Sequence, residues 1–193
     1  MALYYDTTQY TSGDDFFNAI ASVPNFWDSA TEDTLTKGDV TLTYSSGLLT
    51  MTAGNLSTDV NISSPNGGLI AATDKGLVAM HFPTNSNNRY AIGLGCDDNS
   101  VWGAAVSSYQ TVAINSIIAA GVTNKTYEYG STTAANTNTQ IIDLASVKGN
   151  FIFDDLRRVL YAPSAVVNFN GKLTMPNGEK YVKAGAFALR YTE

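Results

Sequence analysis

The spacing of apolar residues predicts a helix in only one part of the chain. Phe16, Ile20 and Val23 follow one another at intervals of four and three, as one face of a helix requires. Ser12 precedes them as a cap candidate, and a proline follows directly after Val23. We therefore expect a helix over residues 14–23, with its aromatic face packed on the chain's own sheet rather than on a partner.

The rest of the chain has the texture of short β-strands separated by Gly, Asn and Asp. Val40-Thr41-Leu42-Thr43-Tyr44 alternates apolar and polar residues, as a half-buried strand does. The turn Ser45-Ser46-Gly47 leads into residues 48–52, so these two runs predict a hairpin. Further strands are expected at 59–63, 68–73, 77–82, 89–94, 101–107 and 110–118. The last run has the hydrophobic content of a helix as well, but its β-branched residues favour a strand.

The C-terminal third combines a polar stretch with a second hairpin. Residues 130–140 contain no large apolar side chain and indicate an exposed loop or linker. The turn 176–179 has Asn-Gly at its centre and separates a strand at 173–175 from strands at 181–183 and 186–191. The whole pattern predicts one all-β domain over residues 1–193, a sandwich or jelly roll with one short N-terminal helix.

Charge is low and unevenly distributed. Eleven basic and seventeen acidic residues give a net charge of −6, which argues against nucleic-acid binding. Residues 1–120 hold three basic and eleven acidic residues, whereas residues 121–193 hold eight basic and six acidic residues. Complementary potentials of this kind can align neighbouring copies, although solvated surface charge is the commoner explanation.

The sequence predicts neither secretion nor membrane insertion. The N-terminal residues show no basic region followed by an apolar stretch, and no apolar run approaches the roughly 18 residues of a membrane-spanning helix. We expect synthesis and folding in a cytosol.

Candidate catalytic and metal-binding groups are few. His81 is the only histidine and Cys96 the only cysteine, which disfavours a catalytic triad and leaves too few ligands for zinc. We expect His81 to be structural. Asp97-Asp98-Asn99 offers oxygen ligands for calcium, but it lacks the EF-hand spacing, so an Asx-rich turn is the favoured interpretation. Glu128 lies between two tyrosines, yet in a strand it would point away from both, so a glycosidase is the least favoured function. We predict no cofactor, no metal and no enzymatic activity.

Several features resemble small β-rich virion proteins of tailed bacteriophages. They are the Thr-, Asn- and Gly-rich strands, the scarcity of Cys and His, the Met1-Ala2 start and the closing segment 181–190. The resemblance extends over the whole chain without a diagnostic motif. It implies a non-enzymatic virion protein, such as a capsid decoration or a head–tail or tail adaptor. Its partners would be copies of itself and other virion proteins, and we expect a homo-oligomer.

The C-terminal third supplies the candidate contact surface, because interface cores favour aromatic residues and arginine. Arg157 and Arg158 belong to the densest charge cluster and suit bidentate contact with carboxylates. The final hairpin adds Lys180, Tyr181, Lys183, Phe187, Arg190 and Tyr191. An alternative remains open, in which the hairpin completes its own sandwich. The alternative function is a carbohydrate-binding β-sandwich module, for which Trp27, Trp102 and the tyrosines are candidate contacts.

Overall fold

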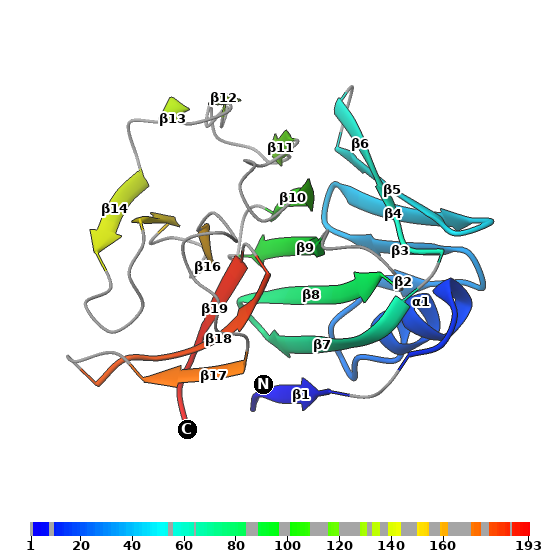
Figure 1. Ribbon diagram of the computed structural model, residues 1–193, viewed down its shortest axis with the longest axis horizontal. Helices are drawn as coiled ribbons and strands as arrows, with labels where there is room; N and C mark the ends of the chain where they lie inside the picture. The colour runs from blue at the N-terminus through cyan, green and yellow to red at the C-terminus, as the bar shows by residue number, and fades with distance from the viewer. Residues whose placement is uncertain are drawn as a thin grey trace.

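A computed structural model shows a layered all-β protein with one short helix near its N-terminus (Figure 1). The structure describes residues 2–7, 10–53, 56–63, 65–83, 89–96, 101–108, 116–119, 128–130, 133–135, 139–143, 150–154, 159–161, 171–174, 178–185 and 187–193. The elements are β1 (Tyr4–Asp6), α1 (Gly13–Ala21), β2 (Ser29–Ala30), β3 (Thr34–Lys37), β4 (Val40–Ser45), β5 (Leu48–Ala53), β6 (Leu56–Asn61), β7 (Pro65–Thr73), β8 (Gly76–Pro83), β9 (Arg89–Cys96), β10 (Val101–Ser108), β11 (Ser116–Ala119), β12 (Glu128–Gly130), β13 (Thr133–Ala135), β14 (Thr139–Asp143), β15 (Asn150–Asp154), β16 (Val159–Tyr161), β17 (Gly171–Thr174), β18 (Lys180–Ala184) and β19 (Phe187–Tyr191).

Three antiparallel sheets make up the layers. The central sheet has the strand order β1-β7-β8-β9-β10-β11, and the helix-side sheet has the order β2-β3-β4-β5-β6. The C-terminal sheet has the order β14-β15-β16-β19-β18-β17, and β12 and β13 form a separate two-stranded ribbon. The predicted all-β sandwich is confirmed. Two of the sheets follow chain order as meanders, which differs from the paired Greek keys of a jelly roll.

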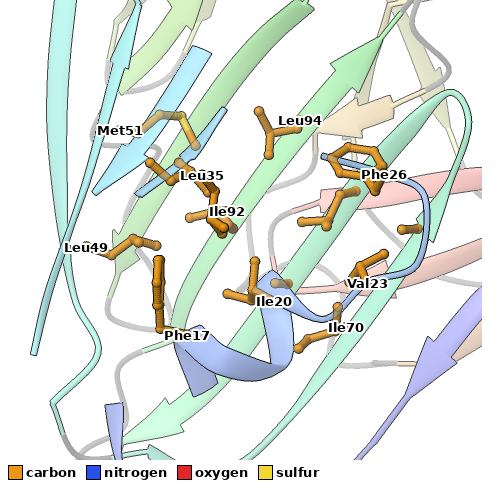
Figure 2. Packing of buried hydrophobic residues seen from close by; sticks show 14 of the residues in the cluster. Phe17, Ile20, Val23, Phe26, Leu35, Leu49, Met51, Ile70, Ile92 and Leu94 are labelled. Atoms are coloured by element: carbon orange, nitrogen blue, oxygen red, sulfur yellow. The ribbon is translucent and has the colours of Figure 1, made fainter. Parts of the chain in front are cut away.

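One face of the central sheet packs against α1 and the helix-side sheet. Ile70 and Ile92 point from the central sheet toward Phe17 and Ile20 of the helix, and Leu35 lies in the same cluster (Figure 2). All five side chains are at most 2% exposed. This cluster is the larger of the two hydrophobic cores among the described residues.

The opposite face of the central sheet packs against the C-terminal sheet. Alternate residues of the same strands, such as Leu69 and Val78, enter a second cluster with Phe187 and Leu189. A Cβ atom built on Gly93 would lie 2.8 Å from the ring of Phe187, so glycine lets this ring rest directly on the central sheet. The central sheet is therefore covered on both faces.

The predicted helix and first hairpin are confirmed with small shifts. The helix covers Gly13–Ala21 rather than residues 14–23, and the Ser12 hydroxyl caps it by accepting a hydrogen bond from the Asp15 amide at 3.0 Å. In the hairpin, Ser45 pairs with Leu48 across the turn Ser46-Gly47. Both turn residues have positive φ angles, 48° and 83°, as a two-residue hairpin turn of type I′ requires.

The prediction of a loop at residues 130–140 needs correction. This range holds β13 together with the end of β12 and the beginning of β14. Thr and Ala in this stretch are compatible with strands even without large apolar side chains, because ladder pairing with a neighbouring strand is a backbone property. In the predicted strand at 110–118, only residues 116–118 lie within the described residues, and they belong to β11.

Candidate functional site

Four residues of the predicted interface are buried within the chain. Tyr181 and Lys183 are each 1% exposed, and Phe187 is completely buried. Tyr191 is 9% exposed and joins Phe187 in the second hydrophobic cluster. These side chains are part of the protein's own core, so the assignment of these four positions to an exposed contact surface is corrected. The alternative, in which the hairpin completes its own sandwich, describes them better.

The remaining interface candidates lie at the surface or outside the described residues. Lys180 forms an ion pair with Glu193 at 2.6 Å, and Arg190 forms one with Glu179 at 2.9 Å. The hydrogen bond from Lys180 lowers the pKa of Glu193. Both pairs link residues of the same hairpin region. Arg157 and Arg158 fall outside the described residues, so their interface role stays a prediction.

His81 occupies the core, as expected for a structural histidine. It is 1% exposed, and its Nε2 lies 3.2 Å from the Asn61 carbonyl oxygen. Its ring stacks on Tyr90 at 5.1 Å and meets the edge of Phe16 at 5.2 Å. Tyr90 is the partner of His81 in the β8–β9 ladder, whereas buried Cys96 lies six positions further along β9, about 20 Å away. His81 and Cys96 therefore cannot form a catalytic pair.

The other candidate groups receive less support. Asp97-Asp98-Asn99 lies outside the described residues, and for Glu128 the structure describes only the backbone, in β12. Within the described part of the chain, no three His, Cys, Asp or Glu side chains form a group that could hold a metal ion. Trp27 packs against the larger core and donates from Nε1 to the Ile20 carbonyl oxygen at 2.8 Å, so it is a structural residue.

The described residues contain a polar cleft where α1 meets one end of the helix-side sheet. Its volume is about 380 Å³. Three segments far apart in sequence form it: the first turns of α1, the turn before β3 and the end of β4 with its hairpin turn. The lining residues are Asp14, Phe17, Asn18, Glu32, Asp33, Tyr44, Ser45 and Ser46.

Tyr44 is the most highly organised side chain of the cleft. Its ring stacks on Phe17 with centroids 5.0 Å apart and an interplanar angle of 16°. Its hydroxyl donates a hydrogen bond to the Asp14 carboxylate and accepts one from the Gly47 amide. Partial burial, and then the bond to Asp14, raise the pKa of Tyr44 to about 12. A Cβ on Gly13 would lie 2.6 Å from this hydroxyl, so the glycine at the start of α1 makes room for it.

The two walls of the cleft beside Tyr44 are also fixed by hydrogen bonds. Oδ1 of Asp33 accepts bonds from the hydroxyls of Thr31 at 3.2 Å and Thr34 at 2.9 Å, while its carbonyl oxygen accepts the Tyr44 amide at 2.8 Å. On the other side, the Gly47 carbonyl oxygen accepts the Ile62 amide at 2.7 Å. The cleft is thus preformed, and it presents carboxylate, amide and hydroxyl groups beside an aromatic ring.

The local sequence pattern does not indicate this cleft. Asp14 lies in the first turn of the helix and Ser45-Ser46-Gly47 in a hairpin turn, so each has an ordinary structural role. The available signal was Tyr44, a large aromatic residue at the last inward position of its strand, but such a residue ordinarily belongs to a core. The β3–β4 ladder places Asp33 beside Tyr44, and the packing of α1 on this sheet adds Asp14.

The one helix of the described residues has nine residues, well below the roughly 20 needed to cross a membrane.

Comparison with known proteins identifies no relative of this chain. No family model, curated protein or solved structure matches the chain.

Proposed function

We propose that the protein is a non-enzymatic structural component of a virion, acting through repeated contacts with copies of itself and with other virion proteins. It is made in the host cytoplasm and serves as a capsid decoration or as a head–tail or tail adaptor. The resemblance of its sequence to small β-rich virion proteins of tailed bacteriophages supports this role. So does its composition, which is rich in Thr, Ser, Asn and Gly and poor in charged residues.

The structural observation that carries the proposal is the position of two edge strands. Strand β1 ends the order of the central sheet and β17 ends that of the C-terminal sheet. Both lie close to the chain termini on one side of the molecule (Figure 1), and the Lys172 ammonium sits 5.1 Å from the centre of the Tyr5 ring. Edge strands expose backbone donors and acceptors that can pair with a strand of another chain. Two adjacent edges give a second copy a common place to dock.

Native mass spectrometry of the purified full-length chain tests this role. We expect a discrete oligomer or a longer assembly whose population rises with protein concentration. Lys172→Pro should weaken it, because proline removes a backbone donor at the β17 edge. Thr192→Pro, at an exposed position after the last strand, is the matched control. A monomer at every concentration tested would contradict the proposal.

A second candidate function, carbohydrate binding, is favoured by one observation. The cleft between α1 and the end of β4 combines an aromatic ring with carboxylate, amide and hydroxyl groups. Sugar rings offer the matching hydroxyls and apolar ring faces. Binding of soluble saccharides to the purified chain, measured by ligand-observed NMR, tests this candidate.

A further inference from the structure

We propose that the cleft formed by Asp14, Asn18, Glu32, Asp33, Tyr44, Ser45 and Ser46 binds a neutral saccharide of one or two sugar rings. The inference rests on the second proposed function and does not depend on assembly into a virion. It adds the site, the size of the ligand and its charge.

The size of the ligand follows from the volume of the cleft. Sites for small molecules are clefts of roughly 300–1,000 Å³. The volume of about 380 Å³ lies at the lower end of that range. It suits a ligand of one or two rings better than a long chain or a large cofactor.

The polarity of the lining favours a ligand with many hydroxyl groups. The carboxylates of Asp14, Glu32 and Asp33 can accept bonds from hydroxyls, and such charge-assisted bonds are the stronger kind. The Asn18 amide and the two serine hydroxyls can both donate and accept. The Tyr44 ring adds an apolar surface suited to the carbon face of a sugar ring.

The charge of the lining restricts the ligand further. Three of the lining side chains are acidic and none is basic. An anionic sugar, such as a uronic or sialic acid, would bring a further negative charge beside them, which is repulsive. The acidic balance of residues 1–120 acts in the same direction. A neutral saccharide avoids this cost.

Preorganisation makes the cleft a better candidate than a surface patch of the same composition. The Tyr44 ring stacks on Phe17, and the Tyr44 hydroxyl is hydrogen-bonded to the Asp14 carboxylate. The Asp33 carboxylate accepts hydrogen bonds from two threonine hydroxyls. Groups held in place before binding lose little freedom when a ligand arrives. Ser46 contributes to the same wall with a left-handed backbone, φ 48°, and the Gly47 carbonyl oxygen of the same turn accepts a hydrogen bond from the Ile62 amide.

The test is a titration of the full-length chain by ligand-observed NMR and calorimetry. The probes are neutral sugars (glucose, galactose, N-acetylglucosamine and their β-linked disaccharides), the acidic sugars glucuronic and N-acetylneuraminic acid, and the cationic probes arginine amide and spermidine. The variants are Asn18→Ala and Glu32→Ala, which alter exposed side chains, with Asp39→Ala as the control. Asp39 is an exposed acid at the opposite end of the β3–β4 hairpin.

We expect at least one neutral saccharide to bind, and each cleft variant to weaken it about tenfold through loss of one or two hydrogen bonds. Asp39→Ala should bind as the unchanged chain does, acidic sugars should not bind, and added salt should leave the affinity unchanged. Binding of a neutral saccharide that neither cleft variant weakens would overturn the site while leaving carbohydrate binding intact. Failure of every saccharide to bind would overturn both, as would salt-sensitive binding of the cationic probes alone.

Discussion

The helix-side sheet and the C-terminal sheet both pack on the central sheet, but they differ in what covers their other face. In β4, Val40 and Leu42 are buried whereas Thr43 is exposed, so the strand shows the alternation of a sheet with one face in water. In β18, the four consecutive residues Tyr181–Ala184 are all buried. Alternation of buried and exposed residues along a strand therefore indicates a sheet with one face in solvent. Consecutive buried residues indicate a strand that is covered on both faces.

This difference also explains the fate of the interface prediction. Aromatic and basic residues close together in the final hairpin have the composition of an interface core, but a doubly covered strand has the same composition. The N-terminal region, which has the cleaner strand pattern, instead leaves a preformed cleft open to solvent. Composition alone therefore does not distinguish an interface core from a strand that is buried within its own chain.

The largest expected effect is on the contact between the C-terminal and central sheets. Phe187→Ala removes the ring that rests on Gly93, and we expect the free energy of unfolding to fall by about 3–5 kcal/mol. Leu48→Ala, at a leucine that is 41% exposed in the helix-side sheet, should change it by less than about 0.5 kcal/mol. Urea denaturation measures both. Equal effects would remove the contrast between the sheets.

Lysine substitutions test the second face of the C-terminal sheet. Lys183 is buried and donates from Nζ to the Gly185 carbonyl oxygen, so Lys183→Ala leaves a cavity and removes this hydrogen bond. We expect a loss of roughly 2–4 kcal/mol in unfolding free energy. Lys172→Ala, in the exposed edge strand, loses a surface cation–π contact with Tyr5, at most about 1 kcal/mol, and a solvent-screened surface attraction to Glu193. Thermal denaturation with the same pair of variants checks the order, and a larger loss for Lys172→Ala would contradict it.

Turn glycines separate backbone strain from packing in the two regions. Gly47 and Gly178 have similar φ angles, 83° and 86°. A Cβ on Gly47 would lie 2.5 Å from the Ser63 Cβ, whereas one on Gly178 would meet nothing within 4 Å. Gly178→Ala should cost about 1 kcal/mol from strain alone, and Gly47→Ala roughly 1–3 kcal/mol more from overpacking. Equal losses in chemical denaturation would show that the Gly47 turn is not held against residue 63.

The last expected effect concerns the proton of Tyr44 and is confined to alkaline pH. Its pKa is raised from 10.0 to about 12 in the folded chain, so the folded state holds this proton more tightly than the unfolded state. The associated stability is fully present below pH 10 and is lost as the pH rises from 10 to 12. Tyr44→Phe should therefore show a shallower fall of unfolding free energy over this window. Identical slopes for the two proteins would contradict the raised pKa that burial and Asp14 give Tyr44.

The sequence was sufficient for the elements that one local rule determines. The helix follows from its apolar spacing and from Ser12, and the β4–β5 hairpin follows from alternation and from the Ser46-Gly47 turn. Local rules fail where burial depends on another layer. Lys183 and Tyr181 would be surface residues in a single sheet, and their burial is a consequence of packing between segments distant in the chain.

The cleft could not be predicted for the same reason. Asp14, Asp33 and Tyr44 each have an ordinary local interpretation, as a helix-start acid, a turn acid and a strand aromatic. The stacking of Tyr44 on Phe17 joins the helix to the sheet and brings the carboxylates together. A hydrophobic pattern with a period of two or of 3.6 residues predicts strands and helices, but it does not predict how the helix packs against the sheet.

Removal of residues 171–193 tests most directly whether the C-terminal hairpin is a layer of the core. We expect the shortened chain to lose cooperative unfolding, as measured by circular dichroism, because Leu69, Val78 and Met80 lose the cover supplied by Phe187 and Leu189. The contrary result would be a shortened chain that unfolds cooperatively with unchanged stability but no longer assembles in native mass spectrometry. That result would contradict a core role and would indicate that the hairpin is a contact segment.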